Sequence, residues 1–173
     1  MEKSRLEYEI IPADIDESVF DHLDVKERVV KLAYEKCKLI AEQYPDHVVI
    51  GADTLTANTD GVVFTKPKPG TDPLDAAMQL SGQIIDVYTG CCVYMPKGKF
   101  QETLAVAQIK YQIFERNDLE RLAEGDSPQI RSGALGVFVD APGFTLIESV
   151  QGSYTGMYGL PMEFVYEQIN KSK

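Results

Sequence analysis

The segment Val48-Val49-Ile50-Gly51-Ala52-Asp53-Thr54 runs from apolar and small residues directly into an acid. Such a run is typical of a strand that is buried on both faces, here ending at a carboxylate. Open α/β sheets bind ligands beyond the C-terminal ends of such strands. Asp53 is therefore the first candidate for chemistry, and Lys66, in the Lys66-Pro67 pair that follows, is the candidate counter-charge. The alternative is that Asp53 only caps a turn, which aspartate often does for local reasons.

The overall charge of the chain limits its partners. The 173 residues include 17 lysines and arginines against 27 aspartates and glutamates, which gives a formal net charge of −10. An acidic chain of this kind is poorly suited to hold a nucleic acid polymer or an anionic membrane by bulk electrostatics. A phosphate compound would have to be bound by a few placed lysines and a metal ion. The length predicts a single domain, and the sequence suggests no transmembrane span.

The three cysteines, Cys37, Cys91 and Cys92, show neither a disulfide framework nor a zinc-binding spacing. We expect buried, reduced thiols in a cytosolic protein. Cys91 and Cys92 should point to opposite faces if they lie on a strand.

The periodicity predicts a long amphipathic helix over residues 24–43, because its apolar residues recur at the helical spacing. Pro45 lies just beyond its end. The apolar stripe consists of Val25, Val29, Leu32, Ala33, Cys37, Ile40 and Ala41. Lys36 lies at the border of this stripe, so its side chain can reach the edge of the core.

Other patterns predict strands at 8–11, 48–52, 87–95 and 103–114. Residues 54–57 and 62–64 flank the turn signal Asn58-Thr59-Asp60-Gly61 and predict a hairpin. Short helices are expected from Thr71 or Asp72 to about residue 81, over 117–123 and over 161–169. Residues 133–143 are glycine-rich and predict irregular structure, and 145–149 predict a short strand or turn.

Three carboxylates, Asp14, Asp16 and Glu17, lie within four residues. Carboxylates clustered on a loop can bind a hard cation such as magnesium through oxygen, although an acidic, solvated loop is the simpler interpretation. If this loop met Asp53, Lys36 and Lys66 in one cleft, the site would suit a phosphate chain with its metal ion.

Eight short motifs follow one another in an order that resembles the Maf family, the septum-formation or Maf-like nucleotide pyrophosphatases. They are Pro12-Ala13-Asp14-Ile15-Asp16-Glu17, Lys31-Leu32-Ala33-Tyr34-Glu35-Lys36, Gly51-Ala52-Asp53-Thr54, Lys66-Pro67, Leu80-Ser81-Gly82, Tyr88-Thr89-Gly90, Gly152-Ser153-Tyr154 and Gly159-Leu160-Pro161. Each motif is weak alone, but the eight in order cover nearly the whole chain from about Tyr8 onward.

The resemblance implies a mixed α/β fold related to inosine triphosphate pyrophosphatases, with a twisted mixed sheet flanked by helices and a central cleft. Residues 1–173 would form a single Maf-like domain, with two lobes around the cleft as an option. The implied reaction is hydrolysis of a nucleoside triphosphate to the monophosphate and pyrophosphate. It would use Mg²⁺ or Mn²⁺ in the cytoplasm, and a homodimer is one expected state.

The resemblance also assigns roles by position. Glu17 and Asp53 would be the metal-linked carboxylates, and Asp53 would be the base for the attacking water. Lys36 and Lys66 would contact the phosphate chain, and Thr54 would help position Asp53.

The chain departs from the family pattern at several points: a family Gln or Glu falls near Phe138, a family histidine is replaced near Ile85, and two whole segments differ. Family members begin with a strand and a Ser-x-x-Arg-Arg loop that holds phosphate, and this sequence starts too late to contain them, which predicts an N-terminally shortened domain. Residues 130–135 replace the family segment Asp-Lys-Ala-Gly-x-Tyr without its acid. The alternative prediction is therefore a catalytically impaired Maf-like protein that binds nucleotides or a partner.

Overall fold

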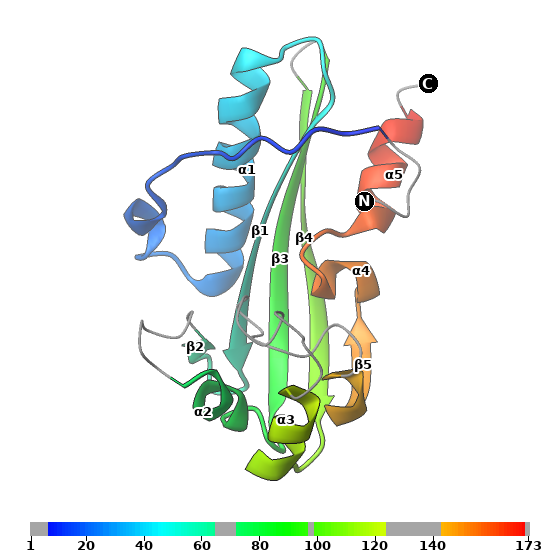
Figure 1. The fold of residues 1–173 in the computed structure, drawn as a ribbon. Helices are drawn as coiled ribbons and strands as arrows, with labels where there is room; N and C mark the ends of the chain where they lie inside the picture. The colour runs from blue at the N-terminus through cyan, green and yellow to red at the C-terminus, as the bar shows by residue number, and fades with distance from the viewer. Residues whose placement is uncertain (1–6, 65–71, 97–98, 124–142, 172–173) are drawn as a thin grey trace.

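The computed structural model describes residues 7–64, 72–96, 99–123 and 143–171, which form a five-stranded sheet flanked by helices (Figure 1). The strands are β1 (Val49–Asn58), β2 (Val63–Phe64), β3 (Ile84–Met95), β4 (Lys99–Tyr111) and β5 (Ile147–Gly152). The helices are α1 (Val25–Gln43), α2 (Pro73–Met78), α3 (Arg116–Ala123), α4 (Tyr154–Met157) and α5 (Met162–Lys171), with the short 3-10 helices η2 (Glu17–Phe20) and η4 (Gly143–Leu146). The expected α/β fold class is confirmed.

The strands lie in the order β2-β1-β3-β4-β5, and each pairing in the described part of the chain is antiparallel. Strand β3 is central, pairing with β1 from Val49↔Tyr94 to Asn58↔Ile85 and with β4 on its other side. The expected hairpin around residues 58–61 is confirmed as β1–β2, with Thr56 opposite Phe64. We expected a mixed sheet, but sequential strands that turn back on themselves become antiparallel neighbours.

Helix α1 matches the expected helix over 24–43. Asp24 caps its start, because one carboxylate oxygen accepts hydrogen bonds from the backbone N–H groups of Lys26 and Glu27, at 2.9 and 3.1 Å. The expected apolar stripe is buried except for Val25, which is half-buried. The stripe packs on one face of the sheet, against residues of β1 and β3 that include Val49, Cys92 and Tyr94.

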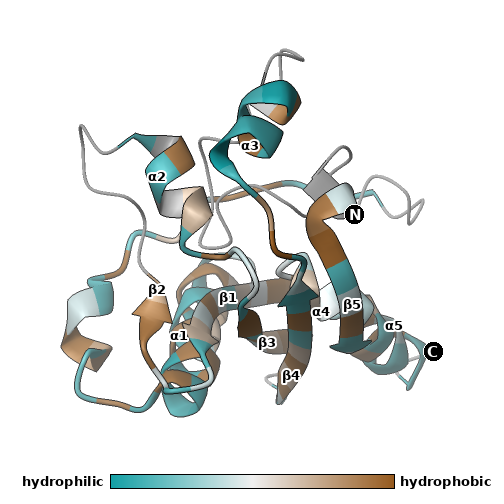
Figure 2. Cartoon of the chain, turned by 90° about the horizontal axis from the view of Figure 1, so that it is seen from below, coloured by the Kyte–Doolittle hydropathy of each residue, from teal (hydrophilic) through white to brown (hydrophobic). Residues whose placement is uncertain are grey.

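The opposite face of the sheet is covered by α2, α3, α4 and α5 (Figure 1). The largest cluster of buried side chains lies here, contributed by β3, β4 and the surrounding helices: Ala77, Leu80, Ile85, Val87, Ala107, Ile109, Tyr111, Phe114, Leu119, Leu146 and Met157. Figure 2 shows α2 and α3 close together at one end of the sheet, with α3 mostly hydrophilic. Arg116 of α3 joins them by pairing with Asp72 and Asp75 at the start of α2.

The cysteines confirm the expectation drawn from their spacing, because all three are buried and free. Cys92 faces α1, in the cluster that contains Cys37. Its neighbour Cys91 faces α5 and packs with Val165. The pair therefore marks the two faces of β3.

The strand expected over 8–11 is wrong. Residues 7–16 are irregular backbone that crosses in front of the sheet (Figure 1), and Ile11 and Ala13 pack against the Cys37–Cys92 cluster instead of pairing with a strand. Strand β4 ends at Tyr111 rather than at residue 114, because the Gln112 N–H donates to the Leu146 carbonyl at 2.9 Å as the chain turns toward η4.

The remaining short elements follow expectation closely. Asp72 caps α2, accepting a 2.9 Å hydrogen bond from the Leu74 N–H. Helices α3 and α5 cover the expected ranges 117–123 and 161–169 within two residues, and β5 includes part of 145–149. The glycine-rich residues 133–142 and Lys66 lie outside the described residues. Within the described part, no helix combines the length and apolarity needed to cross a membrane.

Candidate functional site

The structure brings three of the predicted site residues together. Glu17 lies on η2, Lys36 on α1 and Asp53 on β1, far apart in the sequence. The Lys36 Nζ lies 2.7 Å from Asp53 Oδ1 and 2.7 Å from Glu17 Oε1, so one ammonium is held between two carboxylates. The exposed fractions of the side chains are 49% for Glu17, 19% for Lys36 and 12% for Asp53. The acid–lysine–acid cluster therefore runs from the surface into the protein.

Two glycines allow α1 to lie close enough to the sheet for this contact. A Cβ at Gly51 would come within 2.4 Å of the Ala33 carbonyl oxygen, and one at Gly90 within 2.1 Å of the Val29 carbonyl oxygen. Gly90 is also the register partner of Asp53. Because neither glycine has a side chain, the helix backbone packs directly on β1 and β3 and Lys36 can reach Asp53.

The sequence misplaced Asp53 within its strand. We expected the strand to end at Ala52, with Asp53 at its C-terminal edge, but β1 continues through Asp53 to Asn58. Thr54 and Thr56 are β-branched and favour strands, and both they and Leu55 have partners on β3. Asp53 is therefore held mid-strand under α1, which also excludes the simple role of a turn cap.

Burial and the neighbouring charges shift the pKa values of both Asp53 and Lys36. Burial raises the pKa of Asp53 above its usual range, and the neighbouring Lys36 ammonium offsets this only in part. For Lys36, burial would lower the pKa, but its hydrogen bonds to Asp53 and Glu17 outweigh that effect and the pKa is raised. Lys36 thus remains a cation at neutral pH, beside an acid that is a stronger base than an exposed aspartate.

Thr54 does not join the cluster. Successive strand residues point to opposite faces, and Thr54 faces α4 while Asp53 faces α1. Its hydroxyl lies 2.9 Å from that of Thr89, which donates at 2.8 Å to the Gly156 carbonyl. Since Thr89 uses its proton on Gly156, Thr54 must donate to Thr89. This chain of hydrogen bonds ties β1 and β3 to α4, and within the described part of the chain it does not reach the Asp53 side chain.

Arg28 is a residue of the site region that the sequence analysis missed. Its Nη2 lies 2.6 Å from Asp21 Oδ1, and its charge opposes, without cancelling, the rise that burial causes in the pKa of Asp53. The Arg28 Nε is buried and has no hydrogen-bond partner among the described residues. Its spacing of eight residues from Lys36 on a predicted helix was the available signal, because positions four and eight apart follow one side of a helix.

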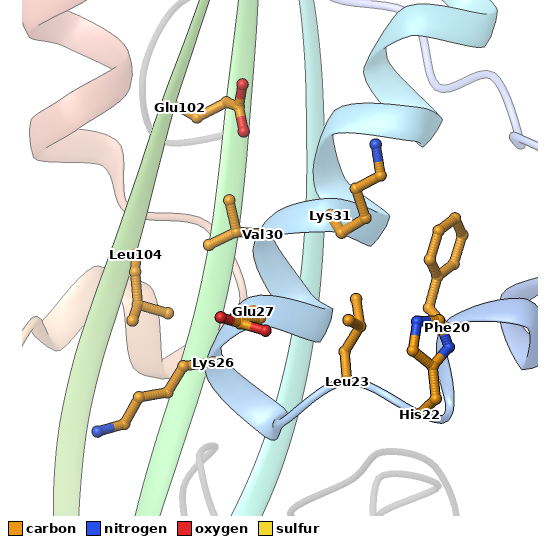
Figure 3. A pocket seen from close by; sticks show the side chains of 9 residues that line it. All are labelled: Phe20, His22, Leu23, Lys26, Glu27, Val30, Lys31, Glu102 and Leu104. Atoms are coloured by element: carbon orange, nitrogen blue, oxygen red, sulfur yellow. The ribbon is translucent and has the colours of Figure 1, made fainter.

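A separate groove lies along α1 on its β4 side (Figure 3). It has a volume of about 610 Å³ and a mostly apolar lining, with Leu104 of β4 across from Phe20 and His22. Glu17, Lys36 and Asp53 are not part of its lining. The groove is therefore not the place where the predicted chemistry would occur.

An α/β domain that holds a lysine between two carboxylates has the charged groups needed to handle a phosphate compound. The chain belongs to the Maf family, since the family model described as Maf-like protein matches residues 1–172. This confirms the resemblance seen in the sequence motifs.

Several curated proteins are similar to this chain over most of its length. The dTTP/UTP pyrophosphatase of Aquifex aeolicus is 32% identical over 162 residues, covering 94% of this chain and 83% of that protein. That of Geobacillus sp. is 30% identical, covering 99% of this chain and 90% of its own length. That of Acinetobacter baylyi is 32% identical, covering 91% and 84%.

Proposed function

We propose that this protein hydrolyses a nucleoside triphosphate to the monophosphate and pyrophosphate, with dTTP and UTP as its substrates. The observation that carries the proposal is the cluster in which Lys36 lies 2.7 Å from both Glu17 and Asp53. The substrate assignment rests on the relatives, which are named dTTP/UTP pyrophosphatases.

In this reaction a water molecule attacks the α-phosphorus. A new bond forms from the water oxygen to phosphorus, the bond from the α-phosphorus to the oxygen bridging to the β-phosphate breaks, and pyrophosphate leaves. Asp53 accepts the proton of the attacking water. A base with a raised pKa suits this step, because proton transfer is most efficient when the pKa of the base approaches the working pH, and burial raises the pKa of Asp53.

Two lysines would balance the phosphate charge. The Lys36 ammonium, now shared by two carboxylates, can contact an incoming phosphate oxygen while keeping its charge. We assign Lys66 the same phosphate-binding role on the basis of the Lys66-Pro67 motif. Such cations stabilise negative charge that develops on the phosphoryl oxygens and the leaving group.

The cluster also fits a divalent cation, Mg²⁺ or Mn²⁺. Glu17 and Asp53 each have an oxygen 2.7 Å from the same nitrogen, so the two carboxylates converge on a small volume. Among the described residues no group of three or more His, Cys, Asp or Glu side chains could hold a metal. A two-carboxylate set is what Mg²⁺ uses when substrate phosphates and water complete its shell. When bound, the ion would polarise phosphoryl oxygens and lower the pKa of a bound water.

The proposed cellular setting follows from the state of the cysteines. Three free, buried thiols are typical of a reducing compartment, so we place the protein in the cytoplasm. A homodimer is the proposed assembly, and sedimentation of the purified protein tests it.

The direct test is pyrophosphate release from a panel of nucleoside triphosphates, with Mg²⁺ or Mn²⁺. Wild type should act on dTTP and UTP, and D53N should lower the rate by about 10²-fold or more. Because D53N also breaks the Lys36–Asp53 ion pair, its circular dichroism spectrum is compared with that of wild type to show that the variant is folded at the assay temperature. The matched control is D86N, which changes a half-buried aspartate of β3 that bonds only Tyr88 and Gln108 among the described side chains and should keep the rate. Full activity in D53N would refute the assignment, and nucleotide binding without any release by wild type would favour the non-catalytic alternative.

A further inference from the structure

Helix α1 contributes two cations to the region of Asp53, because Lys36 pairs with Asp53 and the charge of Arg28 favours its ionised form. The two residues are eight positions apart with Leu32 between them, a spacing that follows one row of the helix surface. At the level of Arg28, the helix backbone presses on the sheet, because the Val29 carbonyl lies against Gly90, the register partner of Asp53. Lys36 approaches Asp53 from further along the helix. Along the helix axis, Asp53 therefore lies between the levels of Arg28 and Lys36.

Within the described part of the chain, only some of the N–H donors of the Arg28 guanidinium have a partner. Arginine offers five N–H donors, and the Arg28 side chain is 25% exposed, with its Nη2 on Asp21. Its Nε is buried without a partner among the described residues. A buried donor without a partner is uncommon in proteins and calls for a water or a ligand to satisfy it.

The 3-10 helix η2 has at its two ends the acids that pair with Lys36 and Arg28. Glu17 begins η2 and pairs with Lys36, and Asp21 caps its C-terminal end and pairs with Arg28. Neither carboxylate is buried, with exposed fractions of 49% and 60%, and η2 contributes no buried residue. Exposed ion pairs of this kind are weak. A polyphosphate has more charge than a carboxylate and accepts the two-pronged hydrogen bonds that arginine donates best.

We propose that Arg28 is a phosphate-binding residue of the nucleotide site, which exchanges its contact with Asp21 for oxygens of the triphosphate or of pyrophosphate. This inference rests on the proposed function, since it names a further residue for the same substrate. It predicts opposite consequences for the two members of one ion pair. Loss of Arg28 removes a phosphate contact, whereas loss of Asp21 removes a competitor for that contact.

The test compares R28Q and D21N in the full-length protein. Calorimetry measures the Kd for Mg²⁺-pyrophosphate, and steady-state kinetics measures KM and kcat for dTTP or UTP. R28Q should raise Kd and KM by about tenfold or more, while D21N leaves them unchanged or lowers them. R28K keeps the positive charge but loses the two-pronged hydrogen bonding of the guanidinium, so its Kd and KM should lie between those of wild type and R28Q. The control pair is K110Q and E148Q, an exposed 2.6 Å ion pair joining β4 to β5, and neither should change the Kd.

Three outcomes would overturn the inference. Equal weakening by R28Q and D21N would show that Arg28 only fastens η2, and a Kd for R28Q equal to that of K110Q would show no contact at all. If R28Q does not fold, a D21N variant that binds pyrophosphate more weakly than wild type is sufficient to reject it. Because pyrophosphate binding is measured apart from turnover, a wild-type protein that binds but does not hydrolyse would refute the proposed function and leave this inference standing.

Discussion

Replacing Lys36 with methionine isolates the electrostatic part of the acid–lysine–acid cluster. Methionine keeps most of the apolar stem and removes the ammonium, so Asp53 becomes a largely buried carboxylate without its main counter-charge. Breaking a buried ion pair costs roughly 3–5 kcal/mol. Glu17 is half exposed and regains water, so it adds little to this cost.

We expect K36M to lose about 3 kcal/mol of unfolding free energy at pH 7, at the lower end of that range because Asp53 can gain a proton. For a chain of this length that corresponds to a melting temperature lowered by roughly 6–12 °C. Burial already raises the pKa of Asp53, and removing Lys36 raises it further. The folded variant then binds this proton more tightly than the unfolded chain, so its stability falls as pH rises.

The assay is urea or thermal unfolding of wild type and K36M across pH 4–8, with K31M as the control. Lys31 lies on the same helix but pairs with Glu35 at a more exposed position, so K31M should differ from wild type by less than about 1 kcal/mol at every pH. The difference in unfolding free energy between wild type and K36M should shrink as pH falls from 7 toward about 4, where the Asp53 carboxyl becomes neutral. The reasoning would be refuted if wild type and K36M were equally stable at pH 7, or if the difference in their unfolding free energies were the same at low and at neutral pH.

Three further changes test the packing and the predicted site. G90A should destabilise the fold by about 3 kcal/mol or more, because its Cβ would lie 2.1 Å from the Val29 carbonyl oxygen; unfolding in urea measures this, and a near-neutral result contradicts the close approach. T89V should cost about 1–3 kcal/mol by leaving the Gly156 carbonyl without its donor, and T89S should restore it in the same assay. K66A should raise the KM for the nucleotide, and unchanged kinetics would remove Lys66 from the site.

Local sequence patterns were sufficient for the elements whose signals lie within a few residues. Helix α1 combines a helical apolar period with the Asp24 cap, and the β1–β2 hairpin has its turn residues between two strand formers. The position of Lys36 at the border of the stripe also follows from the period alone. These features depend on contacts between residues that are close along the chain, so one stretch of sequence contains the information.

The meeting of the site residues depends on the tertiary structure. A period of two does not say in which direction a strand pairs, so the sequence could not reveal that β1 is antiparallel to β3 and runs through Asp53. The same pairing places Thr54 on the face away from Lys36. Gly51 and Gly90 allow α1 to pack closely on the sheet, which brings Lys36 to Asp53, and the packing of η2 against α1 brings Glu17 to Lys36 and Asp21 to Arg28. The sequence by itself determined which charges this protein possesses, and the packing of one helix on two strands decided which of them act together, because those contacts join segments far apart along the chain.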